Sequence, residues 1–103
     1  MLLIMEVKEF QKLASDIVKK IDNKLNVDRD AQLNLSQLLE ELGELARIVN
    51  FKKLRNKNPE KKDLEDEFAD VFLQLSILAD NFDIDLEKSV LDKIEILKKR
   101  HNL

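Results

Sequence analysis

Two groups of acidic residues in this chain have the spacing of a metal site. Glu41 and Glu44 lie three residues apart in a leucine-rich segment, and Glu40 directly precedes them. Glu67 and Asp70 repeat that spacing further along the chain. Residues at i and i+3 share one face of a helix. On adjacent helices, four such carboxylates would converge and repel one another unless a hard divalent cation lay between them.

Helical phase separates the acids that face inward from those that do not. At about 100° per residue, with Glu41 at zero, Glu44 falls at about 300° and Glu40 at about 260°. Glu41 and Glu44 therefore border the apolar stripe of their helix, whereas Glu40 points further away. Glu67 and Asp70 have apolar neighbours on both flanks, so they do not resemble ordinary surface charges.

The alternative is that these acids are surface residues. Charged residues mostly belong on solvated faces, and a glutamate pair at this spacing arises readily by chance in a highly charged chain. Buried carboxylates without a partner are costly, however, so a pair beside the core requires one. Lysine and arginine mostly lie elsewhere in the sequence, and a metal ion fits better.

The composition predicts one helical domain over residues 1–103. The hydrophobic share is 44%, the charged share is 38%, and the chain has one Gly and one Pro, which favours long helices with short connections. Without cysteine there is no disulfide or thiolate site, as is typical of a reducing cytoplasm. The single histidine, His101, lies near the C-terminus, which argues against zinc held by histidines.

Apolar periodicity predicts four helices, over about residues 5–25, 29–54, 60–81 and 86–100. Asp28 or Asp30 is expected to cap the second helix, and Asp85 the fourth. The break at 56–59 contains the proline. Short connections place consecutive helices antiparallel, so we expect an all-α antiparallel four-helix bundle.

The same features argue against several partners. The apolar opening at residues 1–5 is too short for a signal sequence, and no stretch approaches the ~18 apolar residues that a membrane span needs. The net charge is −3, with both signs interspersed, so no footprint for polymeric nucleic acid stands out. We expect a soluble cytoplasmic protein.

The two acidic segments resemble a known family. LLEELGELA at 38–46, followed by DEFADVF at 66–72, is similar to the MazG-like nucleotide pyrophosphohydrolases of the all-α NTP pyrophosphatase superfamily. The pattern of that family is EExxE, a variable spacer and ExxD, and the resemblance covers about residues 33–100. It implies hydrolysis of a nucleoside triphosphate (NTP or dNTP) to the monophosphate and pyrophosphate, with Mg²⁺ as cofactor and Mn²⁺ as a substitute.

By this resemblance the metal ligands are Glu41, Glu44, Glu67 and Asp70, the four that helical phase also favours. Glu40 would assist catalysis beside Glu41 by orienting water. Magnesium would bind phosphate oxygens and lower the pKa of a water that attacks phosphorus.

The resemblance also makes Lys93 and Arg100 candidates for contacts with the phosphates. These two residues are seven positions apart and lie within about 20° on one helix face. The alternative is that basic residues in a last helical turn only complement the helix dipole. Gln74 and Asn81 are further candidates for polar contacts with the substrate. Most of the five phenylalanines are expected in the core.

Leu73 and Ile77 lie on the second flank of the third helix, opposite its other apolar residues. A single bundle of this size has difficulty covering both flanks. We therefore expect a homo-oligomer, a homodimer or homotetramer by the resemblance, with the neighbour's first helix as a candidate to complete the pocket.

Two other classes stay open, and one relative within the superfamily remains to be separated by its substrate. A non-enzymatic helical interaction module would not respond to Mg²⁺ or to Glu41→Gln. A di-iron carboxylate bundle normally uses Glu-x-x-His, which this sequence lacks. A phosphoribosyl-ATP pyrophosphohydrolase would differ from the expected enzyme in its substrate.

Overall fold

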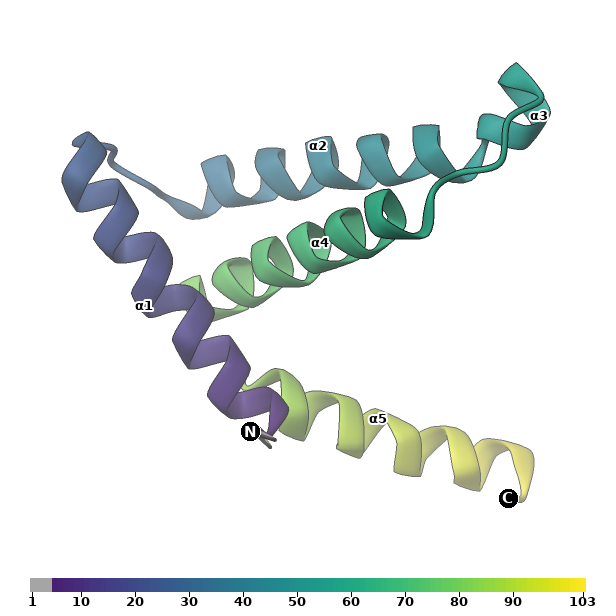
Figure 1. Ribbon diagram of the computed structural model, residues 1–103. Helices are drawn as coiled ribbons and strands as arrows, with labels where there is room; N and C mark the ends of the chain where they lie inside the picture. The colour runs from purple at the N-terminus through teal and green to yellow at the C-terminus, as the bar shows by residue number, and fades with distance from the viewer. Residues whose placement is uncertain (1–4) are drawn as a thin grey trace.

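The computed structural model describes residues 5–103, and all regular structure in that range is helical. Met1–Ile4, which contain most of the apolar opening, lie outside the described residues. The helices are α1 (Val7–Leu25), α2 (Ala31–Val49), α3 (Phe51–Arg55), α4 (Lys61–Asn81) and α5 (Leu86–His101) (Figure 1). The prediction of an all-α fold is confirmed. None of the helices in residues 5–103 is long and apolar enough to span a membrane.

Aspartate side chains begin two of the long helices, as the sequence predicted. Asp30 Oδ1 accepts a hydrogen bond from the backbone N–H of Leu33 at 2.8 Å, so Asp30 rather than Asp28 caps α2. Asp85 Oδ1 accepts one from the N–H of Lys88 at 3.1 Å and caps α5. Each bond satisfies an N–H group that has no partner within its own helix.

The expectation of one helix from 29 to 54 was wrong, because the helix breaks at Asn50. The side chain of Asn50 donates to the carbonyl of Ala46 at 2.8 Å, a local bond by which asparagine competes with the helical backbone. The short helix α3 follows and ends at Asn56, which adopts the left-handed conformation. The tip between α2 and α4 is therefore a separate turn of helix.

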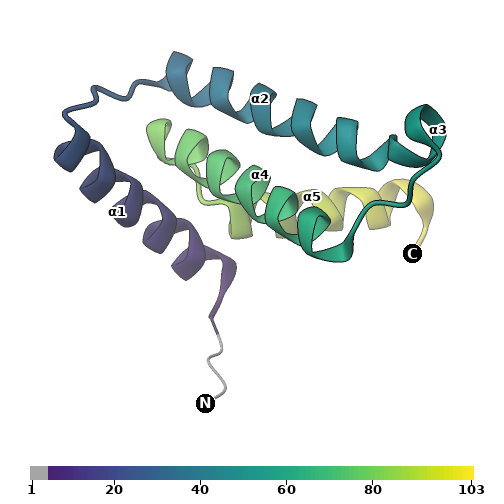
Figure 2. The same ribbon diagram turned by 45° about the horizontal axis from the view of Figure 1, so that its top comes forward.

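Helices α2 and α4 form an antiparallel pair, and α1 crosses α4 (Figures 1 and 2). Gln11 fastens α1 to the turn before α5. Its Nε2 donates to the carbonyl of Ile84 at 2.6 Å, and its Oε1 accepts from the N–H of Leu86 at 3.0 Å. Gln11 is buried, so both bonds form away from bulk water, where an unpaired amide would be costly.

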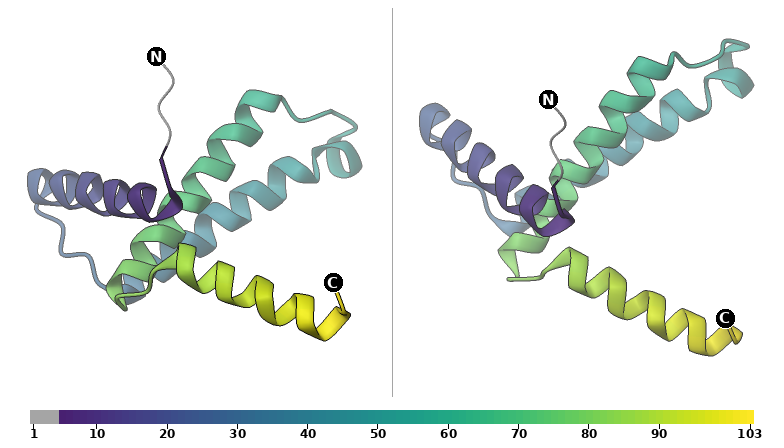
Figure 3. Two further views of the ribbon diagram at one scale, coloured as in Figure 1. Left: turned by 90° about the horizontal axis from the view of Figure 1, so that it is seen from below. Right: turned by 60° about the horizontal axis from the view of Figure 1, so that its bottom comes forward.

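Helix α5 packs chiefly against α1 and diverges from the α2–α4 pair (Figure 3). The four long helices were expected, but a closed four-helix bundle within one chain is not confirmed. The described residues bury few apolar side chains fully; these are Ala14, Leu38, Ile48, Ile77 and Ala79.

Many large apolar side chains stay exposed, and the phenylalanines expected in the core are among them: Phe10, Phe68, Phe72 and Phe82 are all more than a third exposed. Ile77 is buried within the protomer, in a cavity lined partly by α1, so it does not support an oligomer as the sequence suggested. Leu73 remains exposed.

Candidate metal centre

Three carboxylates from two helices meet between α2 and α4. Glu41 lies on α2, and Glu67 and Asp70 lie one turn apart on α4. One carboxylate oxygen from each of the three lies within 4.8 Å of the others. Glu41 and Glu67 are partly buried and Asp70 is exposed, so the group is open to solvent on one side. The antiparallel pairing of α2 with α4 brings together acids that are far apart in sequence.

Two side-chain oxygen atoms, one of them in this group, have no hydrogen-bond partner within residues 5–103. They are Oε2 of Glu67 and Oε1 of Gln74, and both are buried. Buried acceptors are nearly always paired in folded proteins, because an unpaired one forfeits its hydration. A hard cation prefers several oxygen ligands from carboxylates, amides and water. This donor set, with its unpaired oxygen on Glu67, fits a divalent cation.

The surroundings of Glu41 disfavour its charge. Partial burial raises the pKa of Glu41 above its ordinary value, and the adjoining carboxyl of Glu67 and the negative charge of Asp70 raise it further. Glu40 contributes to the same repulsion. A bound cation would reverse this effect by favouring the ionised form.

Of the other acids predicted for the site, Glu44 lies apart from the group of three. Its Oε2 accepts hydrogen bonds from Arg47, from Nη2 at 2.9 Å and from Nε at 3.3 Å. Both partners are about half exposed. Glu44 nevertheless follows Glu41 by one turn of α2. Because α2 and α4 are antiparallel, the step from Glu41 to Glu44 has the same direction as the step from Asp70 to Glu67. Glu40 is exposed, as its helical phase indicated.

A cavity of about 270 Å³ adjoins Glu67 at the tip of the α2–α4 pair. Its lining is formed by Arg47, Ile48, Phe51, Asp63, Asp66 and Glu67. The guanidinium carbons of Arg47 and Arg55 each lie 5.3 Å from the centroid of the Phe51 ring, within the range of a cation–π contact. Sequence reasoning missed Arg47, although its i+3 spacing from Glu44 could have indicated the ion pair.

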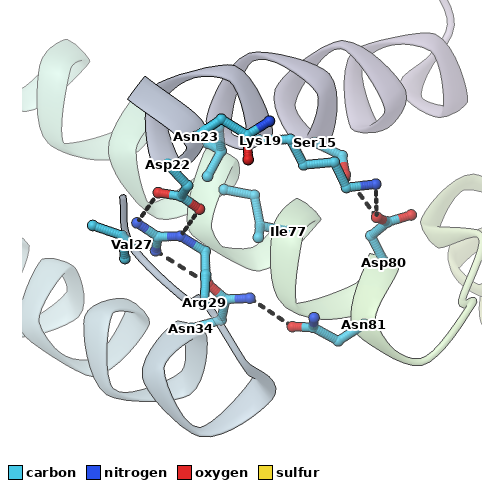
Figure 4. A pocket seen from close by; sticks show the side chains of 11 residues that line it. Ser15, Lys19, Asp22, Asn23, Val27, Arg29, Asn34, Ile77, Asp80 and Asn81 are labelled. Carbon is cyan, nitrogen blue, oxygen red and sulfur yellow. Dashed lines mark hydrogen bonds and ion pairs between the residues drawn. The ribbon is translucent and has the colours of Figure 1, made fainter. Parts of the chain in front are cut away.

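A second polar cluster joins α1, α2 and α4 around a cavity of about 290 Å³ (Figure 4). Arg29 donates to both carboxylate oxygens of Asp22, at 2.7 and 3.1 Å, and to Oδ1 of Asn34 at 3.1 Å. Asn34 in turn donates to Oδ1 of Asn81 at 2.6 Å. Arg29 also donates to the side-chain oxygen of Gln37.

This cluster contains Asn81, which was predicted from the sequence to make a polar contact with the substrate. In the described chain Asn81 bonds to Asn34, two turns of α2 away from Glu41. Asn34 is only 1% exposed, and it was missed by sequence reasoning. The signal was present, because Asn34 precedes Glu41 by seven residues and so lies within about 20° of it on the same face. Gln74, by contrast, follows Asp70 by four residues on α4, so it lies one turn further along the helix face that bears Glu67 and Asp70.

Lys93 and Arg100 lie on α5, and both are exposed. The helix that bears them, α5, diverges from the α2–α4 pair that bears the three carboxylates (Figure 3).

Comparison with known proteins adds to this geometry. Residues 29–103 match the MazG nucleotide pyrophosphohydrolase domain. The chain belongs to the MazG family. The matched segment contains all three clustered carboxylates, and it confirms the resemblance inferred from the two acidic motifs. MazG proteins are nucleotide pyrophosphohydrolases and generally depend on a divalent metal.

The chain is also similar to YpjD, an uncharacterized protein of Bacillus subtilis (strain 168). The two are 33% identical over 85 residues, which cover 76% of this chain and 77% of YpjD.

Proposed function

We propose that this protein is a Mg²⁺-dependent nucleoside triphosphate pyrophosphohydrolase that converts an NTP or dNTP to the monophosphate and pyrophosphate. The observation that supports this best is the convergence of Glu41, Glu67 and Asp70, together with the buried, unpaired Oε2 of Glu67. Oxygen ligands of this kind suit Mg²⁺, with Mn²⁺ as a substitute.

In this proposal Glu41, Glu67 and Asp70 hold the cation, and Glu44 joins them as the fourth ligand. Glu40, exposed beside Glu41, orients a water molecule, and Glu41 assists in catalysis. When bound, the cation would neutralise phosphate charge and activate water for attack on phosphorus. The buried amide oxygen of Gln74 would accept a hydrogen bond from the substrate or from a water beside it.

Lys93 and Arg100 remain proposed contacts for the phosphates, and Asn81 a proposed polar contact. Because α5 diverges from the helix pair that bears the carboxylates, we propose that Lys93 and Arg100 of one copy contact the phosphates bound at the carboxylates of a second copy. Asn81 would act from the polar cluster around Asn34 and Arg29.

We further propose a homo-oligomer, either a dimer or a tetramer. An apolar cavity of about 320 Å³ lies among α1, α4 and α5, lined mainly by Val7, Phe72, Leu75, Leu86, Val90 and Leu91. Phe72, Leu75, Val90 and Leu91 are each 37–58% exposed, and monomers rarely expose extended apolar surface of this kind. A second copy, with the same apolar face, is the partner of matching chemistry.

The test is pyrophosphate release from a panel of standard and modified NTPs and dNTPs, with and without Mg²⁺. We expect Mg²⁺-dependent turnover of at least one of them, and we expect Glu67→Gln to lower that turnover about 100-fold or more. Phosphoribosyl-ATP belongs in the panel, because a preference for it would identify the related pyrophosphohydrolase instead. No turnover of any nucleotide in the presence of Mg²⁺ or Mn²⁺ would sink the proposal and favour a non-enzymatic module.

A further inference from the structure

Glu44 and Arg47 form an ion pair, but each is also close in the fold to part of the proposed site. Glu44 follows Glu41, a member of the carboxylate group, by one turn of α2. Arg47 lines the cavity that also contains Glu67. The pair is about half exposed, and exposed pairs are weak enough to be exchanged for better partners.

We propose that Arg47 changes partners when the site is loaded. It leaves Glu44, which then joins the metal cluster, and it binds the phosphate chain of the substrate in the adjoining cavity. This inference rests on the proposed function. It adds a substrate contact, Arg47, that α2 supplies within the same protomer as the carboxylates.

The chemistry of the cavity supports this role. Asp63, Asp66 and Glu67 line its other walls, so a polyphosphate would require both a cation and a donor to enter. The planar guanidinium of Arg47 can donate two parallel hydrogen bonds to phosphate oxygens. The Phe51 ring, 5.3 Å from the guanidinium carbon of Arg47, supports that group without using its N–H donors.

Arg55 provides a matched control. Its guanidinium carbon also lies 5.3 Å from the Phe51 ring, but Arg55 does not line the cavity beside Glu67 or pair with Glu44 in the described chain. Arg47→Ala and Arg55→Ala therefore remove the same charge and the same kind of ring contact. Only the first removes the partner of Glu44.

The experiment titrates Mn²⁺ alone, and then tripolyphosphate in the presence of Mn²⁺, by calorimetry. Arg47→Ala should tighten Mn²⁺ binding about two- to fivefold, the range expected for releasing an exposed ion pair. The same variant should weaken tripolyphosphate binding about tenfold or more, because a charge-assisted hydrogen bond is lost. Arg55→Ala should change neither affinity appreciably, and thermal melts followed by circular dichroism would show whether both variants are folded.

A double-mutant cycle separates partner exchange from general electrostatics. With Glu44→Gln in place, Arg47→Ala should no longer tighten Mn²⁺ binding. Persistence of that effect, or equal effects of Arg47→Ala and Arg55→Ala, would overturn the inference. Unchanged affinities with only a lowered melting temperature would overturn it too. Because the titrations need no turnover, each of these results is distinct from a failure of the wild-type protein to hydrolyse nucleotides.

Discussion

Glu41 of α2 and Glu67 of α4 bring carboxylate oxygens within 4.8 Å of each other, and Oε2 of Glu67 is buried without a hydrogen-bond partner in residues 5–103. Two like charges this close oppose the packing of the helices that bear them. Without a cation, repulsion between these carboxylates therefore destabilises the α2–α4 pair, and cation binding would relieve that repulsion. Stability and ligand binding are expected to respond in opposite directions when these acids are neutralised.

Glu67→Gln is the first test of this opposition. Without metal the variant should melt a few degrees above the wild-type protein, because repulsion with Glu41 and Asp70 is relieved. With Mg²⁺ the turnover of nucleotide should fall about 100-fold or more, since even groups that only orient metal ligands are worth about 10- to 100-fold. Melting in chelator and pyrophosphate release measure the two effects.

Glu65→Gln is the matched control, because Glu65 lies on the same helix and is exposed. It should leave both quantities nearly unchanged. A melting temperature of Glu67→Gln below that of the wild-type protein in chelator would contradict the repulsion argument.

The raised pKa of Glu41 predicts a pH dependence for the metal-free protein. Below the ordinary value of 4.5 the carboxyl is protonated in both the folded and the unfolded state. Between 4.5 and the raised pKa the folded state binds more protons, so the free energy of unfolding falls as the pH rises through that window. Glu41→Gln has no such proton, and it should be more stable than the wild-type protein at pH 7.

Urea unfolding in chelator at several pH values measures this difference. The gap in stability between Glu41→Gln and the wild-type protein should close as the pH falls toward 4.5. Comparison with Glu65→Gln controls for the loss of one negative charge, because Glu65 is exposed and is not among the groups that raise the pKa of Glu41. A gap that stays constant with pH would show that Glu41 is not the titrating group.

The sequence predicted the elements that depend on local chemistry. Asp30 and Asp85 begin their helices because a short acidic side chain reaches a backbone N–H two or three residues on. The helical phase of Glu41, Glu67 and Asp70 was also readable, since it depends only on spacing within one helix.

Other features of the structure depend on side-chain contacts that the spacing of residues does not predict. The break at Asn50 follows from a side-chain bond to Ala46 that competes with the helix. The spacing of Glu44 and Arg47 allows an ion pair, but it does not show that Glu44 pairs with Arg47 and lies apart from Glu41, Glu67 and Asp70. The direction of α5 depends on Gln11, whose bonds span more than 70 residues of sequence. The oligomeric state and a cytoplasmic location stay predictions.

Asn34 is expected to stabilise the junction of α1, α2 and α4. Asn34→Ala removes the bonds to Asn81 and Arg29, and it leaves Asn81 and part of the guanidinium unpaired. The free energy of unfolding should fall by about 1–3 kcal/mol, as measured by urea denaturation. Asn23→Ala is the control, because Asn23 is exposed beside the same cavity and should cost less than about 0.5 kcal/mol. Equal effects of the two would mean that the network contributes little.

The exposed apolar face formed by α4 and α5 should hold two copies of the chain together. Leu91, 58% exposed on α5, lines the apolar cavity. Leu54, 74% exposed, lies on α3 at the tip of the α2–α4 pair (Figure 1) and does not line that cavity. Leu91→Asp should weaken self-association about tenfold or more, because burying a charge in an apolar interface is costly. Leu54→Asp should leave it unchanged. Light scattering after size-exclusion chromatography, over a range of protein concentrations, gives the mass of each variant. A wild-type protein that is monomeric at all concentrations, or equal effects of the two substitutions, would contradict this assignment of the interface.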